Sequence, residues 1–245
     1  MTAMPSRKRS SPTQTAPTRP RVRRGSEEDA ERLRDELLGA ALALFIEGGL
    51  DAVTMRAVAT QVGVSAMTPY RYFEDKSHLL RGIWHHVVQA AAHAMREASA
   101  GVDDARDRIR AQVNAFIDYW EAHPQHYRLV YMTEQTTRRD EQGMLTSSPT
   151  YSGILEASLD ASRRFAEEIG GDPAHAKLAS DVRFLMLSGY LQARLVNQRY
   201  PWSPVDVLRP TFIELILEAM ASCLRHGPQR APAAVRRVAR PRSAQ

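Results

Sequence analysis

The chain of 245 residues is long enough for one large or two modest domains, and its 43% hydrophobic residues can supply a packed core. It lacks both an apolar secretory stretch at its polar N-terminus and any apolar run near the roughly 18 residues that cross a bilayer. Cys223, its single cysteine, excludes an internal disulfide. These features predict a cytoplasmic protein without a membrane partner.

Charge is distributed unevenly along the chain. The formal net charge is +5, yet residues 1–25 carry seven bases and residues 226–245 carry five, with no acid in either segment. Residues 26–225 hold all 28 acids against 21 bases, so the body of the chain is acidic. Basic segments on either side of a folded body can hold phosphates. The alternative is that both segments are merely solubilising tails.

Residues 1–25 are rich in Ser, Thr, Pro and Arg and have no apolar period, which predicts a disordered basic arm. The first helix is expected to begin at Ser26, because the acids that follow favour the positive end of a helix dipole. Leucines then recur at helical spacing as far as Phe45. The pair Gly48 and Gly49 predicts the helix end, since glycine tolerates the left-handed conformation found there.

Two short helices are predicted next. Thr54 caps the first, and Gly63 makes the turn that follows it. Ala59 is small, so the two helices can cross closely at this position. Ser65 is expected to cap the second helix, which ends near Tyr72.

The remainder of the chain shows little strand signal. Apolar stripes at helical spacing predict helices over residues 76–99, 103–122, 150–169, 174–198 and 205–225. Pro124 opens a further short helical piece, and the polar residues 134–149 are expected to form a loop. Residues 227–245 are expected to be a disordered basic tail. The predicted fold class is therefore all-α.

The stretch from Thr54 to Phe73 has the pattern of a helix-turn-helix. Two short helices joined by a tight turn place the second helix in a DNA major groove. Thr54 and Ser65 leave free backbone N–H groups at helix starts, where phosphates bind well. Tyr70 and Tyr72 add hydroxyl groups, and Phe73 is expected to enter the core. The alternative is a three-helix packing unit that binds no nucleic acid.

This stretch resembles the DNA-binding domain of the TetR family, the tetracycline-repressor-like regulators, over about residues 30–82. The matching positions are Phe45, Gly48, Thr54, Arg56, Ala59, Gly63, Val64, Ser65, Tyr70, Tyr72, Phe73, Lys76, Leu79 and Leu80. The resemblance implies an N-terminal three-helix DNA-binding domain over residues 26–76. It also implies a C-terminal helical domain over residues 77–226 that binds a small-molecule effector and forms a homodimer.

The resemblance assigns roles to individual residues. It implies that double-stranded DNA is contacted at its phosphates by Thr54, Tyr70, Tyr72 and Lys76. It implies that the side chains lying against base edges are Arg56, Ala66, Met67 and Thr68. The expected DNA-binding set is completed by Ser65 and Arg71.

Two departures from the family pattern affect this surface. Tyr72 stands where relatives often have His, and it still offers a hydroxyl to a phosphate. Pro69 removes one backbone donor early in the second helix, where we expect only a mild kink. The apolar Ala66 and Met67 suit contact with thymine methyl groups.

The DNA-binding domain itself is short of positive charge. Residues 26–80 carry five bases and ten acids. A negative domain gains little from general attraction to phosphates, so we expect the N-terminal arm to supply part of the affinity for DNA.

The C-terminal domain offers a set of aromatic and apolar candidates for an effector pocket. They are Trp84, Phe116, Tyr119, Trp120, Tyr127, Tyr131, Met186 and Tyr190. The alternative for each is an ordinary place in the core. By family position, helices 174–198 and 205–225 are the expected dimer helices.

Catalytic and metal-binding patterns are not found. The histidines at 85, 86, 93, 123 and 126 have no accompanying cysteine or carboxylate pattern of metal type, and no nucleophile elbow occurs. We therefore expect no cofactor, no metal site and no enzyme activity. The leading hypothesis is a repressor released from a palindromic operator by a small apolar effector, with activation left open. The alternative is a helical small-molecule binding or interaction protein with little DNA activity.

Overall fold

The computed structural model describes residues 25–132 and 149–228, and every regular element within these ranges is helical. The elements are α1 (Gly25–Ala52), α2 (Met55–Val62), η1 (Pro69–Arg71), α3 (Lys76–Ala98), α4 (Ala105–Ala122), α5 (Pro124–Tyr131), α7 (Pro149–Ile169), η2 (Pro173–His175), α8 (Ala176–Val196) and α9 (Val205–His226). The all-α prediction is confirmed. Nearly all of the predicted basic arm 1–25, the predicted loop 134–149 and the predicted tail 227–245 lies outside the described residues, and Gly25, predicted to be in the arm, begins α1.

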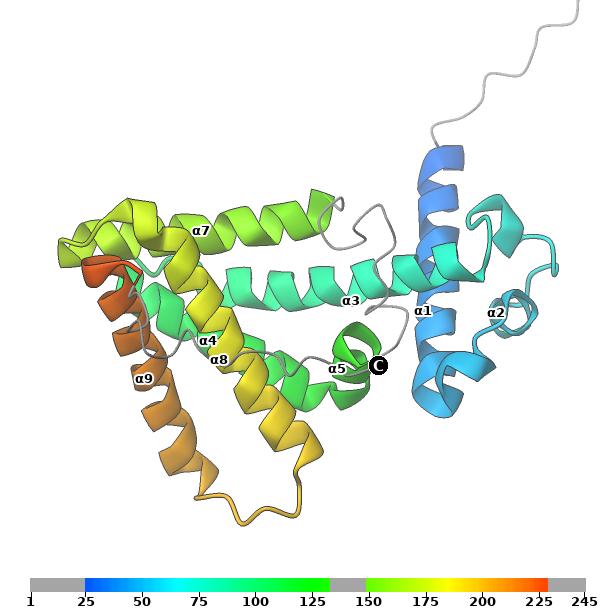
Figure 1. The fold of residues 1–245 in the computed structure, drawn as a ribbon. Coiled ribbons are helices and arrows are strands. Elements are labelled where there is room, and N and C mark those ends of the chain that lie inside the picture. The colour runs from blue at the N-terminus through cyan, green and yellow to red at the C-terminus, as the bar shows by residue number, and fades with distance from the viewer. Residues whose placement is uncertain (1–24, 133–148, 229–245) are drawn as a thin grey trace, which may run out of the picture.

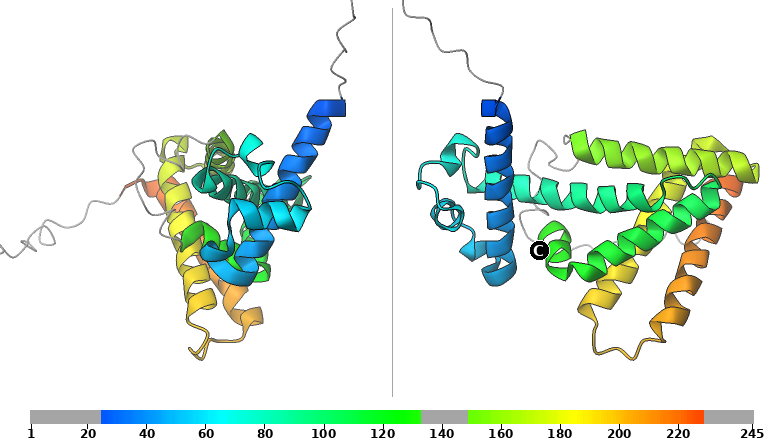
Figure 2. Two further views of the ribbon diagram at one scale, coloured as in Figure 1. Left: turned by 90° about the vertical axis from the view of Figure 1, so that its right-hand side faces the viewer. Right: turned by 180° about the vertical axis from the view of Figure 1, so that it is seen from behind.

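The helices form two groups joined by one long helix (Figure 1). α1, α2 and η1 make a small unit at one end, and α4, α5, α7, α8 and α9 pack into a larger bundle at the other. α3 begins in the small unit and runs into the bundle, as the view from behind also shows (Figure 2). The two ends of the molecule are thus connected by a continuous helix.

The small unit has its own apolar centre. Leu37, Leu38, Val58 and Phe73 are buried there, and Phe73 takes the core position predicted for it. A Cβ added at Gly82 of α3 would lie 2.7 Å from a methyl group of Leu38 and 3.2 Å from the ring of Phe73. A glycine at this position therefore allows α3 to cross α1 closely.

The end of the first helix agrees with its sequence signal. Gly49 has φ 70° and ψ −165°, which interrupts the helical backbone before the last residues of α1. A residue with a side chain adopts this conformation only with strain, because its Cβ approaches the neighbouring carbonyl oxygen. The helix therefore stops at the predicted glycine pair.

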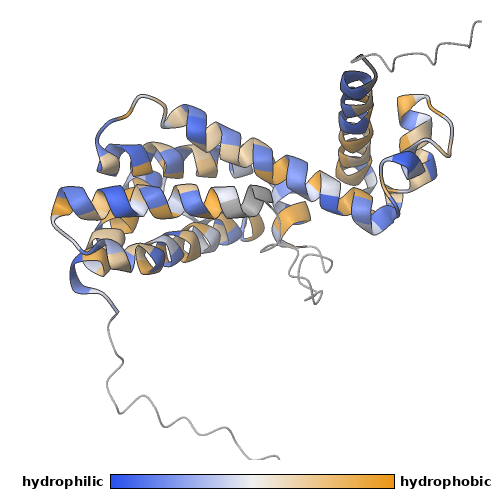
Figure 3. Ribbon diagram, turned by 90° about the horizontal axis from the view of Figure 1, so that it is seen from above, coloured by the Kyte–Doolittle hydropathy of each residue, from blue (hydrophilic) through white to orange (hydrophobic). Residues whose placement is uncertain are grey.

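The bundle helices are amphipathic, with hydrophobic and hydrophilic residues sharing each turn (Figure 3). The largest fully buried side chain is Trp120 on α4, and α9 buries Ile216, Leu217 and Met220. α8 and α9 pack against each other along the bundle. None of the described helices is long and apolar enough to cross a membrane.

Candidate nucleic-acid interface and helical core

α2 is held at both ends by local hydrogen bonds. Thr54 is extended, with φ −129° and ψ 150°, and its hydroxyl oxygen accepts a hydrogen bond from the Ala57 amide at 3.1 Å. Gly63 is left-handed at φ 78°, and its amide donates to the carbonyl oxygen of Thr60 at 3.2 Å. The Val64 amide bonds the Ala59 carbonyl at 2.9 Å. The predicted cap and turn are confirmed, and the Thr54 hydroxyl satisfies one of the free N–H groups at the start of α2.

The segment after Gly63 differs from the predicted second helix. Ser65 begins a turn closed by the Thr68 amide, which donates to the Ser65 carbonyl at 2.9 Å. A single 3₁₀ turn, η1, then covers Pro69–Arg71. The prediction of a helix capped by Ser65 and running to Tyr72 was wrong in form, although its position along the chain was right.

Pro69 is the physical reason for this difference. In an α-helix the residue at this position would donate its amide to the Ser65 carbonyl, and proline has no amide hydrogen. The Thr68 amide occupies that carbonyl instead, and the Ser65 hydroxyl lies 2.9 Å from the Thr68 hydroxyl rather than on a backbone N–H. Residues 65–71, called the recognition segment below, are therefore a compact turn followed by one 3₁₀ turn.

The expected DNA-binding side chains share one end of the molecule and are mostly accessible. Met67 is 69% exposed and Tyr70 is 50% exposed, although both are large and partly apolar. The other exposed members are Thr54, Arg56, Ser65, Ala66 and Arg71. Thr68, Tyr72 and Lys76 are half-buried. The structure therefore brings all ten residues together on α2, the recognition segment and the start of α3.

Lys76 also has a contact within the protein. Its ammonium donates a hydrogen bond to the Leu50 carbonyl oxygen at 2.7 Å, which ties the start of α3 to the residues after Gly49. Asp75 caps α3 by accepting a hydrogen bond from the His78 amide at 2.7 Å. An ammonium has three N–H donors, so Lys76 can hold this contact and still meet a phosphate.

The cations of the small unit fall into two groups. On α1, Arg32 lies 3.1 Å from Asp29 in an exposed ion pair, and the Arg34 guanidinium lies 5.5 Å from the centre of the Phe73 ring. Arg56 and Arg71 are exposed and form no ion pair with any residue in the described ranges. The two arginines of the predicted DNA surface are therefore available to bind an external anion.

Five of the eight candidate effector residues form one aromatic cluster around Trp120. The Trp120 ring centre lies 5.0–5.9 Å from those of Phe116, Tyr119, Tyr127 and Tyr131. Trp120 is 1% exposed, and its indole N–H finds no acceptor in the described part of the chain. A buried donor without an acceptor is costly, so this N–H is the polar group of the cluster that remains to be satisfied.

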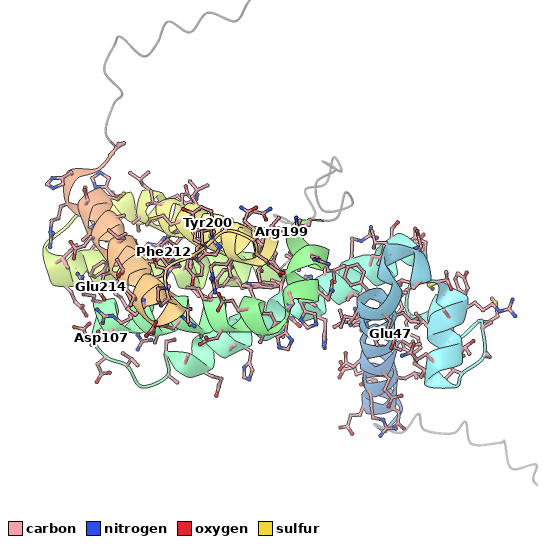
Figure 4. All side chains as sticks on the ribbon, turned by 90° about the horizontal axis from the view of Figure 1, so that it is seen from below. Glu47, Asp107, Arg199, Tyr200, Phe212 and Glu214 are labelled. Atoms are coloured by element: carbon pink, nitrogen blue, oxygen red, sulfur yellow. The ribbon has the colours of Figure 1, made fainter. Side chains whose placement is uncertain are left out.

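The other three candidates belong to the same hydrophobic core, but none has a ring contact with Trp120 in the described part of the chain. Trp84 is buried on α3, where its indole N–H also finds no acceptor among the described residues. Met186 is half-buried on α8. Tyr190 stacks on Phe212 of α9 with ring centres 4.6 Å apart, and Figure 4 labels Phe212 in this position. The predicted set is thus one cluster plus residues on two neighbouring helices.

The cluster is connected to the helix that leads to the small unit. The Tyr119 hydroxyl donates to the Val87 carbonyl of α3 at 3.1 Å and lies 3.1 Å from Nδ1 of His126. Burial raises the pKa of Tyr119 to about 12. Burial, with the nearby His123 and His86, lowers the pKa of His126 to about 4. Both groups are therefore neutral at pH 7, and they join α4 and α5 to the middle of α3.

A second polar network joins α4 to α9. Arg110 donates to Glu214 at 2.8 Å and also contacts Asp107, and both acids are labelled in Figure 4. Arg106 lies 3.0 Å from Glu214 and 2.8 Å from Glu218. These exposed pairs hold one edge of the bundle, and sequence spacing alone did not reveal them.

Sequence reasoning also missed Arg183. It lies on the buried face of α8 and is 5% exposed. The available signal was a charged residue in register with Ala179, Leu187 and Tyr190, which are also buried.

Comparison with known proteins places this geometry in a family. Residues 37–83 match the model described as bacterial regulatory proteins, tetR family. Over 115 residues the chain is 33% identical to the HTH-type transcriptional activator FasR of Mycolicibacterium smegmatis, covering 47% of this chain and 52% of FasR. Over 56 residues it is 52% identical to the HTH-type transcriptional repressor KstR of the same organism, covering 23% of this chain and 27% of KstR. The matched region spans about half the length of FasR and less of KstR.

Solved structures extend the likeness of fold to the bundle. A TetR from Streptomyces coelicolor, SCO7222, superposes with a TM-score of 0.57 at 22% identity, covering 78% of this chain and 99% of that chain. A TetR variant from Acinetobacter baumannii AYE in complex with minocycline gives a TM-score of 0.52 at 18% identity, covering 76% and 93%. Together these comparisons show that residues 37–83 match the tetR family of bacterial regulatory proteins and that the fold of the described chain resembles that of solved TetR structures.

Proposed function

We propose that the chain is a DNA-binding transcriptional regulator that represses by occupying a palindromic operator and leaves it when a small apolar effector binds the bundle. The observation that carries the proposal is the exposed surface of α2 and the recognition segment, which lies within the family match. One relative is named an activator and another a repressor, so the sign of regulation depends on where the operator lies.

The DNA contacts follow from the position of each group. Phosphates meet the free N–H groups of the first turn of α2 and the hydroxyls of Thr54, Tyr70 and Tyr72. Base edges meet Arg56 together with the turn from Ser65 to Thr68, where Met67 is the most exposed apolar side chain. Lys76 positions the start of α3 and adds a phosphate contact with its remaining N–H groups.

The effector is proposed to bind at the aromatic cluster around Trp120. The cluster combines large apolar rings with a buried indole N–H that needs an acceptor. A related TetR structure holds minocycline, which supports a ligand site in this fold. Because Tyr119 bonds the backbone of α3, movement in the cluster can shift α3 and with it the DNA surface.

A homodimer through α8 and α9 is the proposed binding unit. Leu185 on α8 and Leu215 on α9 are 69% and 56% exposed, so each helix carries an apolar side chain that a partner subunit could cover. A two-fold dimer also suits two half-sites spaced by about one DNA turn of 34 Å.

The proposed division of the chain follows these roles. Residues 26–76 are proposed as the DNA-binding domain and residues 77–226 as the effector and dimer domain, with α3 beginning at the boundary between them. The basic segments 1–25 and 227–245 are proposed to contact the DNA backbone. We propose a cytoplasmic regulator without catalytic activity.

Selection and sequencing of DNA fragments bound by the purified full chain tests this function. The expected result is a two-fold symmetric sequence with half-sites about one helical turn apart. The Arg56→Ala variant should enrich it more weakly, whereas Arg32→Ala, which removes an acid-paired arginine from α1, should enrich it as the wild type does. Enrichment of no sequence would contradict the proposal and favour a helical small-molecule binding protein.

A further inference from the structure

Arg183 is a buried cation that has no counter-charge among the described residues. It is 5% exposed and is the one charged side chain among the buried residues of the described ranges. Its Nη2 donates to the Ser158 hydroxyl of α7, while its Nη1 is buried and has no hydrogen-bond partner among the described residues. Burial lowers the pKa of Arg183 to about 10, so the guanidinium stays charged at pH 7.

The groups around Arg183 are polar but neutral. The buried hydroxyls of Ser162 and Ser180 lie 2.8 Å apart, and the Ser162 hydroxyl donates to the Ser158 carbonyl at 3.0 Å. The Ser180 hydroxyl approaches the same carbonyl at 3.4 Å. These hydroxyls satisfy one another and the backbone, and none of them supplies a negative charge to Arg183.

The acids on the neighbouring turns are engaged with other bases. On α8, Asp181 lies 2.5 Å from Lys177. On α7, the pairs are Asp160 with Arg164 at 3.0 Å and Glu156 with Arg163 at 3.9 Å. The acids closest in sequence on both helices are therefore held in exposed pairs, and the buried guanidinium is left without a counter-ion in the described part of the chain.

An anion bound against Nη1 would remove the cost of burying an unpaired charge. The planar guanidinium matches a carboxylate in shape and can bind it through two parallel N–H groups. A carboxylate carries one negative charge at pH 7, which the single guanidinium balances. A phosphate monoester carries about −1.5 to −2, so part of its charge would stay buried and unbalanced.

The surroundings also indicate what the rest of the ligand is. The buried face that holds Arg183 continues with Leu187 and Tyr190. The next residue along α8, Phe184, is 46% exposed and lies outside this buried face, although its ring centre is 6.5 Å from that of Tyr131. A ligand whose acid group lies at Arg183 would therefore have an apolar body directed along the buried face of α8, toward Leu187 and Tyr190.

We propose that Arg183 anchors the carboxylate of the effector, which is a hydrophobic monocarboxylic acid. This inference rests on the proposed effector response, and it names the class of effector and the residue that selects it. The uncharged analogue with the same carbon chain loses the anchor and should bind far less tightly.

Isothermal titration of the full chain with octanoate, decanoate and dodecanoate, each beside the matching 1-alkanol, tests the inference. At least one acid should bind about 30-fold or more tightly than its alkanol, as the loss of one partner from a buried charged pair predicts. The alkanol has the same apolar chain, so it controls for general amphiphile binding. The acid that binds should also weaken binding to the selected operator.

Arg183→Met should lower affinity for that acid by a similar factor and leave affinity for the alkanol unchanged. Arg183→Lys keeps the positive charge but lacks the planar guanidinium. Its affinity for the acid should lie between those of the wild type and Arg183→Met. Arg163→Met removes an exposed arginine from α7 with the same change in charge, and should bind as the wild type does. A circular dichroism melt that matches the wild type shows that each variant is folded, independently of DNA binding.

Equal binding of acid and alkanol by the wild type would overturn the inference, as would undiminished acid binding by Arg183→Met. Binding of none of the three acids would also overturn it. Titration without DNA separates this test from the proposed function. A chain that binds acid through Arg183 but enriches no operator would contradict the DNA-binding role and leave the anchor standing.

Discussion

The small N-terminal unit presents its functional groups at the surface, whereas the bundle keeps them inside. Met67 and Tyr70 are large side chains exposed to solvent, and the backbone beneath them is fixed by local caps at Thr54 and Gly63. Trp120 and Arg183 are almost fully buried and depend on several helices packing around them. Substitutions in the first region should therefore change DNA affinity, and substitutions in the second should change stability or ligand binding.

The largest expected effect is on the stability of the bundle. Trp120→Ala removes a fully buried indole from among four neighbouring aromatic rings and should lower the free energy of unfolding by about 3–5 kcal/mol. Trp120→Phe keeps most of the apolar volume and should cost less. Urea unfolding followed by circular dichroism measures both. A loss below about 1 kcal/mol for Trp120→Ala would mean that the cluster is not the core of the bundle.

Substitutions in the DNA surface should lower the affinity for DNA and leave the stability of the protein almost unchanged. Arg56→Ala should weaken operator binding by about 1–3 kcal/mol, because a base-reading arginine is removed. Its free energy of unfolding should stay within about 0.5 kcal/mol of the wild type, because Arg56 is exposed and unpaired among the described residues. Fluorescence anisotropy with labelled operator and a thermal melt give the two numbers. If stability falls as much as affinity, Arg56 is a structural residue.

A smaller loss of stability is expected at Thr54, which both caps α2 and belongs to the predicted DNA surface. Thr54→Ala removes the side-chain cap of α2 and should destabilise the small unit by about 1 kcal/mol. Thr54→Ser keeps the hydroxyl and should restore most of that loss. Hydrogen exchange of the α2 amides measures the change locally. Equal exchange in the wild type and Thr54→Ala would show that the cap does not stabilise this helix.

The smallest effect expected is a pH dependence of the bundle. The unfolded chain protonates His126 near its ordinary pKa of 6.5, and the folded chain only near 4, so stability falls as pH decreases through this window. His126 is partly exposed, and solvent screening limits the size of the effect. His126→Gln should flatten the dependence between pH 6.5 and 4 relative to the wild type, as urea midpoints at several pH values would show. Parallel curves for the two proteins would assign the acid sensitivity to other groups.

The features that depend on residues close together in the sequence were predicted most accurately. The helix stop at Gly49, the cap at Thr54 and the turn at Gly63 each depend on backbone geometry within a few residues, and each was found in place. The long bundle helices were predicted because their apolar stripes are strictly periodic. The prediction of a second α-helix after Gly63 was wrong, although the reason, Pro69, is also local. The missing amide of Pro69 prevents the helix there, where only a mild kink was expected.

Contacts between distant segments could not be predicted in the same way. The bond from Lys76 to the Leu50 carbonyl joins residues 26 positions apart. Four of the other candidate effector residues have their rings around Trp120, whereas the candidate Tyr190 stacks on Phe212 of α9. The burial of Arg183 follows from the packing of α7 on α8, which the sequence of α8 alone indicates only as a charge on an apolar face.

The central claim is specific recognition of DNA by the exposed surface of the small unit. The most direct measurement is the affinity of the full chain for its selected two-fold sequence and for a scrambled duplex at the same salt concentration. Binding to the selected sequence should be tighter by a factor of about 10³ or more, as specific regulators require. Equal affinity for the two duplexes would contradict the claim and leave only general attraction to phosphates.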